Sequence, residues 1–117
     1  MARLTDPERL QCYLNALANW RFEGYIRLTP FAEEAFKRLK LGMPERQFRQ
    51  LLYEYVQRGG EIDEVKETRP EWSDWTYHYD LRPIINGRTL YVESRLDYKD
   101  PHDPDDPLIV IVNIHDA

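Results

Sequence analysis

The fold is decided by residues 75–98, whose sequence is WTYHYDLRPIINGRTLYVESRLDY. Asn86-Gly87 lies between two runs rich in aromatic and β-branched residues. This pattern predicts a β-hairpin closed by a type I′ turn, because both central residues of that turn need positive φ. A two-residue loop fixes the register, so that Ile85 faces Arg88. One face of the predicted hairpin then carries these further pairs: Leu81 with Val92, Tyr79 with Ser94, Tyr77 with Leu96 and Trp75 with Tyr98.

The other face of the predicted hairpin is charged. Two interpretations of this face are open. In the first, it is a solvated surface on which diagonal neighbours, Asp80 with Arg95 and Arg82 with Glu93, offset one another's charge. In the second, it is a site where His78 can change charge near neutral pH, and where arginines bind a phosphate or stabilise developing negative charge. The pairs on this face are Arg82 with Tyr91, Asp80 with Glu93, His78 with Arg95 and Thr76 with Asp97.

Helical patterns precede the hairpin. The segment Thr5-Asp6-Pro7-Glu8 has capping-box spacing with Thr5 at the cap, and it predicts a helix over about residues 6–20. Thr29-Pro30 opens a second helix, for which Gly42 fits the C-terminal cap. Pro44 begins a third helix, which Gly59-Gly60 ends. Apolar stripes on these helices predict that they pack on a core.

Three further segments are expected to be strands. A short edge strand is expected over residues 25–28, and a charge-protected edge strand over residues 61–67. Residues 108–112 are continuously apolar, as in a strand covered on both faces near the middle of a sheet. Alternation along this last strand places Asn113 and His115 on the same side as Ile109 and Ile111, with a charged tip near the polar face of the hairpin.

The element order predicts an α+β fold in a single domain over residues 1–117. We expect about three helices packed on one face of a mainly antiparallel sheet of about four strands. No secretory signal or membrane-spanning run is visible, so a cytoplasmic protein without membrane partners is expected. Cys12 is the only cysteine. This excludes an intrachain disulfide and a cysteine-based zinc site.

Charge is unevenly distributed over the chain. The net charge is −5 and the pI is about 5.2, which weighs against broad attraction to nucleic acid. Residues 1–60 nevertheless carry ten Lys or Arg against seven Asp or Glu, whereas residues 61–117 carry six against fourteen. A basic group near the turn between the second and third helices is either an ordinary solvated surface or a patch that binds RNA or a partner. It contains Lys37, Arg38, Lys40, Arg46 and Arg49.

No metal or cofactor is expected. The three histidines lack metal-ligand spacing, since His102 and His115 lie thirteen residues apart and His78 is remote from both. The Asp-rich segment 97–107 resembles a calcium loop only superficially, because it lacks the central Gly and the closing Glu. A solvated connector is the favoured interpretation of this segment, and cation binding is the alternative.

Four features of the chain carry a resemblance to a known family. They are the pattern Leu28-Thr29-Pro30-Phe31-Ala32, a basic residue at Arg38, the segment Gly42-Met43-Pro44-Glu45, and a last strand ending in residues 109–114. Together they resemble the RelE/ParE-like toxin superfamily and small domain families related to it. The resemblance covers about three-quarters of the chain. It implies a ribonuclease directed at RNA or the ribosome, with an antitoxin as protein partner, or a relative that kept the fold and lost the chemistry. Such families often carry a His where this chain has Phe31, so a catalytic role is not carried over to that position.

Two functions follow as hypotheses. The first is a metal-independent endoribonuclease, in which His78 or Glu93 removes the 2′-hydroxyl proton, Arg82 and Arg95 stabilise phosphate charge, and His115 protonates the leaving oxygen. The second is a non-catalytic acidic interaction module, whose Asp-rich loop and Trp72 dock a basic partner.

Overall fold

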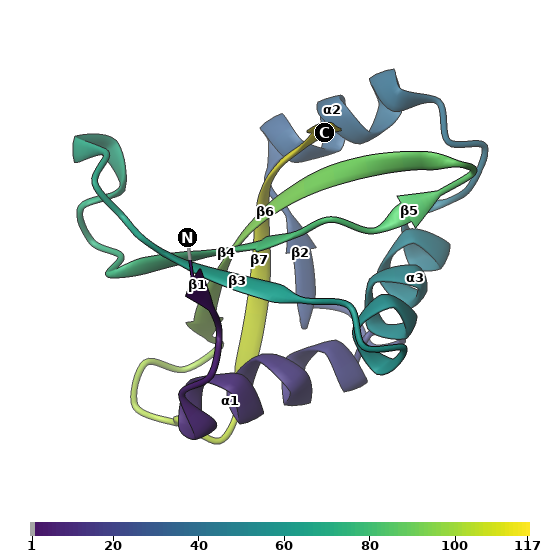
Figure 1. The fold of residues 1–117 in the computed structure, drawn as a ribbon. Helices are drawn as coiled ribbons and strands as arrows, with labels where there is room; N and C mark the ends of the chain where they lie inside the picture. The colour runs from purple at the N-terminus through teal and green to yellow at the C-terminus, as the bar shows by residue number, and fades with distance from the viewer. Residues whose placement is uncertain (1) are drawn as a thin grey trace.

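The computed structural model describes residues 2–117, which form three α-helices, one 3₁₀ helix and seven strands (Figure 1). The expected α+β class is confirmed. The bounds are β1 Ala2–Arg3, α1 Pro7–Ala18, β2 Ile26–Leu28, α2 Pro30–Leu39, α3 Glu45–Gln57, β3 Ile62–Lys66, η1 Pro70–Trp72, β4 Tyr77–Leu81, β5 Ile84–Ile85, β6 Arg88–Tyr98 and β7 Pro107–Asp116.

The sheet is larger than the expected four strands, and that expectation is wrong. The strand order is β1-β3-β4-β6-β7-β2, with β5 pairing to β6 beside this path. Every pair is antiparallel except β2 with β7, which is parallel, so the sheet is mixed. Strands of two or three residues, such as β1 and β5, are too short to show a period in sequence. Strand β3, expected at an edge, lies between β1 and β4.

The turn and the central register of the hairpin are as predicted. Asn86 and Gly87 have φ of 53° and 74°, as a type I′ turn requires. Ile85 faces Arg88, and the ladder between β4 and β6 pairs Tyr79–Ser94, Asp80–Glu93 and Leu81–Val92. Arg82 and Pro83 separate β4 from β5, because proline has no N–H to donate to a ladder. The other predicted pairs fall outside this ladder: Trp75–Tyr98, Thr76–Asp97, Tyr77–Leu96, His78–Arg95 and Arg82–Tyr91.

A β-bulge in β7 reverses the faces of the last strand. Ser94 faces Ile111, whereas the preceding residue Glu93 faces Asn113, so Val112 is the extra residue of the bulge. The expectation that Asn113 and His115 share a side with Ile111 is therefore wrong. The bulge transfers both side chains to the face that carries Asp80 and Glu93.

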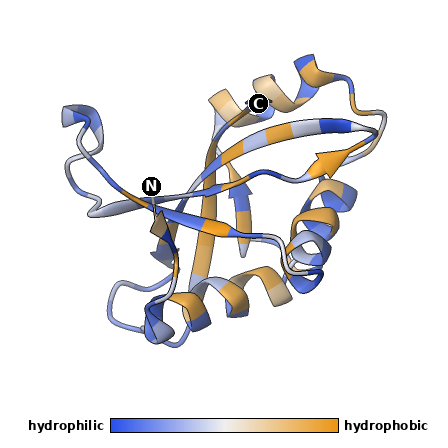
Figure 2. Ribbon diagram, in the orientation of Figure 1, coloured by the Kyte–Doolittle hydropathy of each residue, from blue (hydrophilic) through white to orange (hydrophobic). Residues whose placement is uncertain are grey.

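The helices pack on the apolar face of the sheet. One hydrophobic cluster joins buried residues of all three helices to alternate strand residues. In Figure 2 much of β7 is coloured as hydrophobic. The buried Tyr13 hydroxyl of α1 also bonds to Ser94 Oγ at 2.8 Å, so the one polar strand residue facing α1 here is satisfied. Members of the cluster include Tyr13, Leu17, Phe36, Phe48, Leu52, Ile62, Leu81, Val92, Ile111 and Ile114.

Two helix ends differ from expectation in the residue that forms the cap. Asp6, rather than Thr5, caps α1, because its carboxylate accepts a hydrogen bond from Arg9 N at 2.9 Å. Thr29 caps α2 as predicted, with Oγ1 accepting from Ala32 N at 3.1 Å. Helix α2 ends at Leu39, three residues before Gly42, since Lys40 itself adopts the left-handed conformation, with φ of 51°.

Candidate functional site

The charged side of the hairpin continues across four neighbouring strands, opposite the helices. We call this surface the polar face. The registers of β3, β4, β6 and β7 place its members in facing positions. Its side chains form two groups with different burial and different partners. The polar face comprises Asp63, Val65, His78, Asp80, Arg82, Tyr91, Glu93, Arg95, Asn113 and His115.

The first group is a buried ion network around Arg95. This side chain is 0% exposed, and its Nη2 lies 3.0 Å from both Glu67 Oε2 and Glu93 Oε2. Arg69 joins the same two carboxylates at 2.8 Å and 2.5 Å. Trp72 of η1 covers the guanidinium of Arg95, with 4.7 Å from Cζ to the ring centroid. Segment 67–72 therefore closes over this part of the sheet and removes Arg95 from solvent.

The network changes the acidity of one of its carboxylates. Hydrogen bonds from Arg69 and the nearby charge of Arg95 lower the pKa of Glu67 from 4.5 to about 2. A carboxylate with a lowered pKa in the folded state contributes stability above its unfolded pKa, and that contribution is lost as pH falls.

We therefore expect the free energy of unfolding to fall steeply between pH 4.5 and about pH 2. The Glu67→Gln variant should show a flatter profile in that window, because it has no carboxylate to protonate there. Urea denaturation at several pH values measures this. Glu71→Gln, an exposed neighbour, is the matched control and should keep the wild-type slope. Equal slopes for wild type and Glu67→Gln would contradict the assignment.

The diagonal ion pairs expected on the hairpin are replaced by pairs with other segments. Arg95 bonds to Glu67 and to Glu93, its neighbour on β6, rather than to Asp80. Arg82 pairs with Asp63 of β3 at 2.5 Å rather than with Glu93. Long-range partners from β3 and the segment after it thus pair the charges of both arginines, although Arg95 Nε is buried without a hydrogen-bond partner among residues 2–117.

The second group is organised around a His–Asp pair. His78 Nδ1 lies 2.8 Å from Asp80 Oδ1, and the two side chains are 12% and 3% exposed. A carboxylate only accepts, so Nδ1 carries the proton and Nε2 has the lone pair of the neutral ring. Within residues 2–117, Nε2 has no hydrogen-bond partner and is not enclosed. In the neutral ring, this arrangement presents Nε2 as an acceptor held in one orientation.

Tyr91 links that pair to Arg82 and His115. Burial, together with the nearby carboxylate of Asp80, raises the pKa of Tyr91. The guanidinium of Arg82 lies over the Tyr91 ring, 5.4 Å from its centroid. The ring of His115 on β7 stacks on the ring of Tyr91 on β6, and the two ring centroids lie 4.8 Å apart. His78, Arg82 and His115 therefore belong to one cluster, which we call the Tyr91 cluster.

His115 is exposed and oriented by the backbone. Its Nδ1 lies 2.7 Å from the carbonyl oxygen of Asp116, and since a carbonyl only accepts, Nδ1 is protonated. A second proton then resides on Nε2 when the ring is charged. The two histidines of the Tyr91 cluster thus suit opposite roles, one accepting and one donating a proton at Nε2.

The predicted site residues are thereby divided. Arg82 and His115 both contact Tyr91, and His78 connects to this cluster through Asp80. Glu93 and Arg95 instead lie in the buried ion network. Trp72, expected to dock a partner, instead packs on Arg95. Sequence reasoning missed Glu67, Arg69 and the linking role of Tyr91. Of these three residues, only Tyr91 was indicated by the sequence, because the predicted register places it opposite Arg82.

The basic group at the ends of α2 and α3 does not form one uniform patch. Lys37 lies 3.8 Å from Glu34, and Lys40 is the left-handed C-cap of α2. Arg46 packs on the ring of Trp20, 5.2 Å from its centroid. Arg49 lines a cavity that also contains Glu33 and Glu45. The acidic residues beside these basic side chains reduce the local positive charge. The remaining member of the group, Arg38, lies on α2.

The Asp-rich connector uses several carboxylates on its own backbone. Asp100 accepts from His102 N at 2.9 Å, and Asp103 accepts from Asp105 N at 3.0 Å. Over residues 2–117 no group of three or more His, Cys, Asp or Glu side chains has a metal-binding arrangement. Within the same range, no helix is long and apolar enough to cross a membrane.

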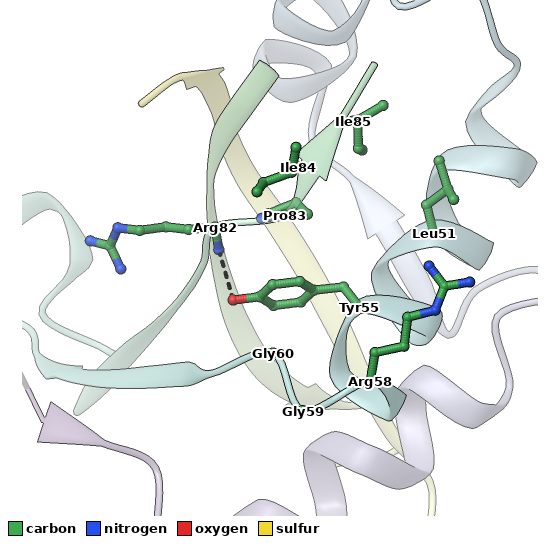
Figure 3. A pocket seen from close by; sticks show the side chains of 9 residues that line it. All are labelled: Leu51, Tyr55, Arg58, Gly59, Gly60, Arg82, Pro83, Ile84 and Ile85. Carbon is green, nitrogen blue, oxygen red and sulfur yellow. Dashed lines mark hydrogen bonds between the residues drawn. The ribbon is translucent and has the colours of Figure 1, made fainter. Parts of the chain in front are cut away.

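A separate cavity of about 420 Å³ lies between α3 and β5 (Figure 3). Leu51, Tyr55 and Ile84 line it, and Tyr55 Oη accepts from Arg82 N at 3.4 Å. In Figure 3 the guanidinium of Arg82 points away from Tyr55, on the side of the chain opposite α3. This cavity therefore does not take part in the Tyr91 cluster.

Comparisons with protein-family models, curated proteins and solved structures give no match for this chain. A proposal for the function of the chain therefore rests on the geometry and chemistry of the Tyr91 cluster.

Proposed function

We propose that the protein cleaves RNA at a phosphodiester bond without a metal ion, using the Tyr91 cluster. The observation that supports this most is the His78–Asp80 pair, in which Nδ1 lies 2.8 Å from Asp80 Oδ1 and Nε2 has no hydrogen-bond partner among residues 2–117. A buried carboxylate that fixes the tautomer of an imidazole is a recurrent arrangement for a general base.

The proposed reaction is an internal transesterification. His78 Nε2 removes the proton of the ribose 2′-hydroxyl, and the 2′-oxygen attacks the adjacent phosphorus. The bond from phosphorus to the 5′-oxygen breaks, and His115 Nε2 gives that oxygen a proton. Arg82, 35% exposed, donates to the phosphate oxygens as charge accumulates there. The products are a 2′,3′-cyclic phosphate and a 5′-hydroxyl end, so atoms and protons balance.

Arg95 has no place in this reaction. At 0% exposure it offers no surface to a substrate, and its charge is matched by Glu67 and Glu93. We assign Arg95 a role in the stability of the fold.

Net charge limits how the substrate is held. At −5 the protein gains little long-range attraction for a polyanion. Binding energy must then come from short-range contacts to bases and from Arg82.

The test is RNA cleavage in the presence of a chelator. Wild-type protein should produce 2′,3′-cyclic phosphate ends, and His78→Ala should be slower by about 100-fold or more, because the general base is lost. His102→Ala, in the exposed connector, is the matched control and should cleave at the wild-type rate. Equal rates for wild type and His78→Ala would contradict the assignment. An absence of cleavage by wild type would favour the non-catalytic interaction module instead.

A further inference from the structure

A cavity of about 290 Å³ opens beside the Tyr91 cluster, where the start of α2, η1 and strands β6 and β7 meet. It lies at the lower end of the size range of small-molecule pockets and suits one planar ring system. Its lining combines aromatic and polar side chains, among them Phe31, Arg69, Trp72, Glu93, Val112 and Asn113.

Aromatic side chains provide surfaces for stacking. Phe31 is 60% exposed at the start of α2 and lines the cavity, so its ring is available for stacking. Trp72 is partly exposed, and the guanidinium of Arg95 supports its ring at 4.7 Å. Single-stranded bases are commonly held on such side chains.

Polar groups in the cavity have unused hydrogen-bonding capacity. Glu93 Oε2 receives the short bonds from Arg69 and Arg95, whereas Oε1 has only a 3.5 Å contact with Arg69 Nη1. The Asn113 side-chain amide makes no hydrogen bond within residues 2–117 and supplies both a donor and an acceptor. A carboxylate beside an amide donor matches guanine, whose N1–H and N2–H₂ are adjacent donors and whose O6 is an acceptor. Adenine, cytosine and uracil lack two adjacent donors next to an acceptor on that edge.

The register connects this cavity to the Tyr91 cluster. Glu93 faces Asn113, and the next same-face pair along the strands is Tyr91 with His115. Two residues along a strand span roughly 7 Å. A single nucleotide can bridge that distance with its base in the cavity and its 3′-phosphate at His115 and Arg82. The β-bulge at Val112 is what aims Asn113 into this position.

We propose that this cavity binds the guanine base immediately 5′ of the cleaved phosphate and so makes the protein selective for guanosine. The inference rests on the proposed RNA cleavage, and it assigns substrate specificity to residues outside the acid–base pair.

Calorimetric titration with guanosine 3′-monophosphate and adenosine 3′-monophosphate tests the cavity independently of cleavage. The guanosine nucleotide should bind about 10-fold more tightly. Phe31→Ala and Asn113→Ala should each weaken guanosine binding about fivefold or more, through lost stacking and a lost hydrogen bond. Phe22→Ala, also exposed but not in the cavity lining, is the matched control and should bind as wild type does.

Equal affinity for the two nucleotides, or unchanged binding by Phe31→Ala and Asn113→Ala, would overturn the guanine assignment. The two proposals fail separately. Selective guanosine binding without RNA cleavage would overturn the proposed reaction and leave the cavity assigned. RNA cleavage that depends on His78 but shows no preference for guanosine would support the proposed reaction and overturn the guanine assignment.

Discussion

The Arg95→Ala variant is expected to lose about 3–5 kcal/mol of unfolding free energy, the usual cost of removing one partner of a buried ion pair. In the folded protein Arg95 is 0% exposed and contacts Glu67 and Glu93, which are 2% and 6% exposed. Removing the guanidinium leaves two poorly solvated carboxylates with only Arg69 between them. It also removes the support beneath Trp72. Urea denaturation followed by circular dichroism measures the loss.

Arg58→Ala is the matched control for this experiment. Arg58 is 79% exposed and lies 3.9 Å from Glu54, so its removal should change the unfolding free energy by less than about 0.5 kcal/mol. A loss below about 1 kcal/mol for Arg95→Ala would show that the network is not a structural element. It would return Arg95 to consideration as a functional residue.

Asp80→Asn is expected to slow RNA cleavage by about 100- to 10,000-fold while leaving the fold intact. The amide has nearly the shape of the carboxylate, but it can present an N–H to His78 Nδ1. That contact favours the tautomer with the proton on Nε2, where the base needs a lone pair. The substitution would also remove the negative charge near Tyr91 that helps to raise the pKa of its hydroxyl.

Single-turnover cleavage under chelator measures the effect, with thermal unfolding recorded for each variant. Asp105→Asn makes the same chemical change in the exposed connector and should leave the rate unchanged. Cleavage by folded Asp80→Asn within twofold of wild type would show that the His78–Asp80 pair does not orient the base.

Local rules predicted the parts of the fold that depend on neighbours in sequence. Asn86-Gly87 predicted the turn, and the turn predicted the pairs Tyr79–Ser94 and Asp80–Glu93, which the structure confirms. The polar character of the face with His78 and Arg82 followed from the same register. These features depend on backbone geometry that two or three residues determine.

Features that depend on distant segments were not predictable. The bulge at Val112 occurs inside an apolar run, where no residue type marks an extra residue, yet it decides the face of Asn113 and His115. The partners of Arg95 include Glu67, 28 residues away, and their contact requires the chain after β3 to fold over the sheet. Strands β1 and β5 exist only because longer neighbours offer them a ladder.

The most direct measurement compares two oligonucleotides that are identical except for one 2′-deoxyguanosine at the preferred cleavage position. The proposed reaction uses the 2′-oxygen as nucleophile, so wild-type protein under chelator should cleave the all-ribose strand at that position and leave the substituted strand uncut there. Cleavage of both strands at that position with equal rates would contradict the account, because no transesterification by the Tyr91 cluster can proceed without the 2′-hydroxyl.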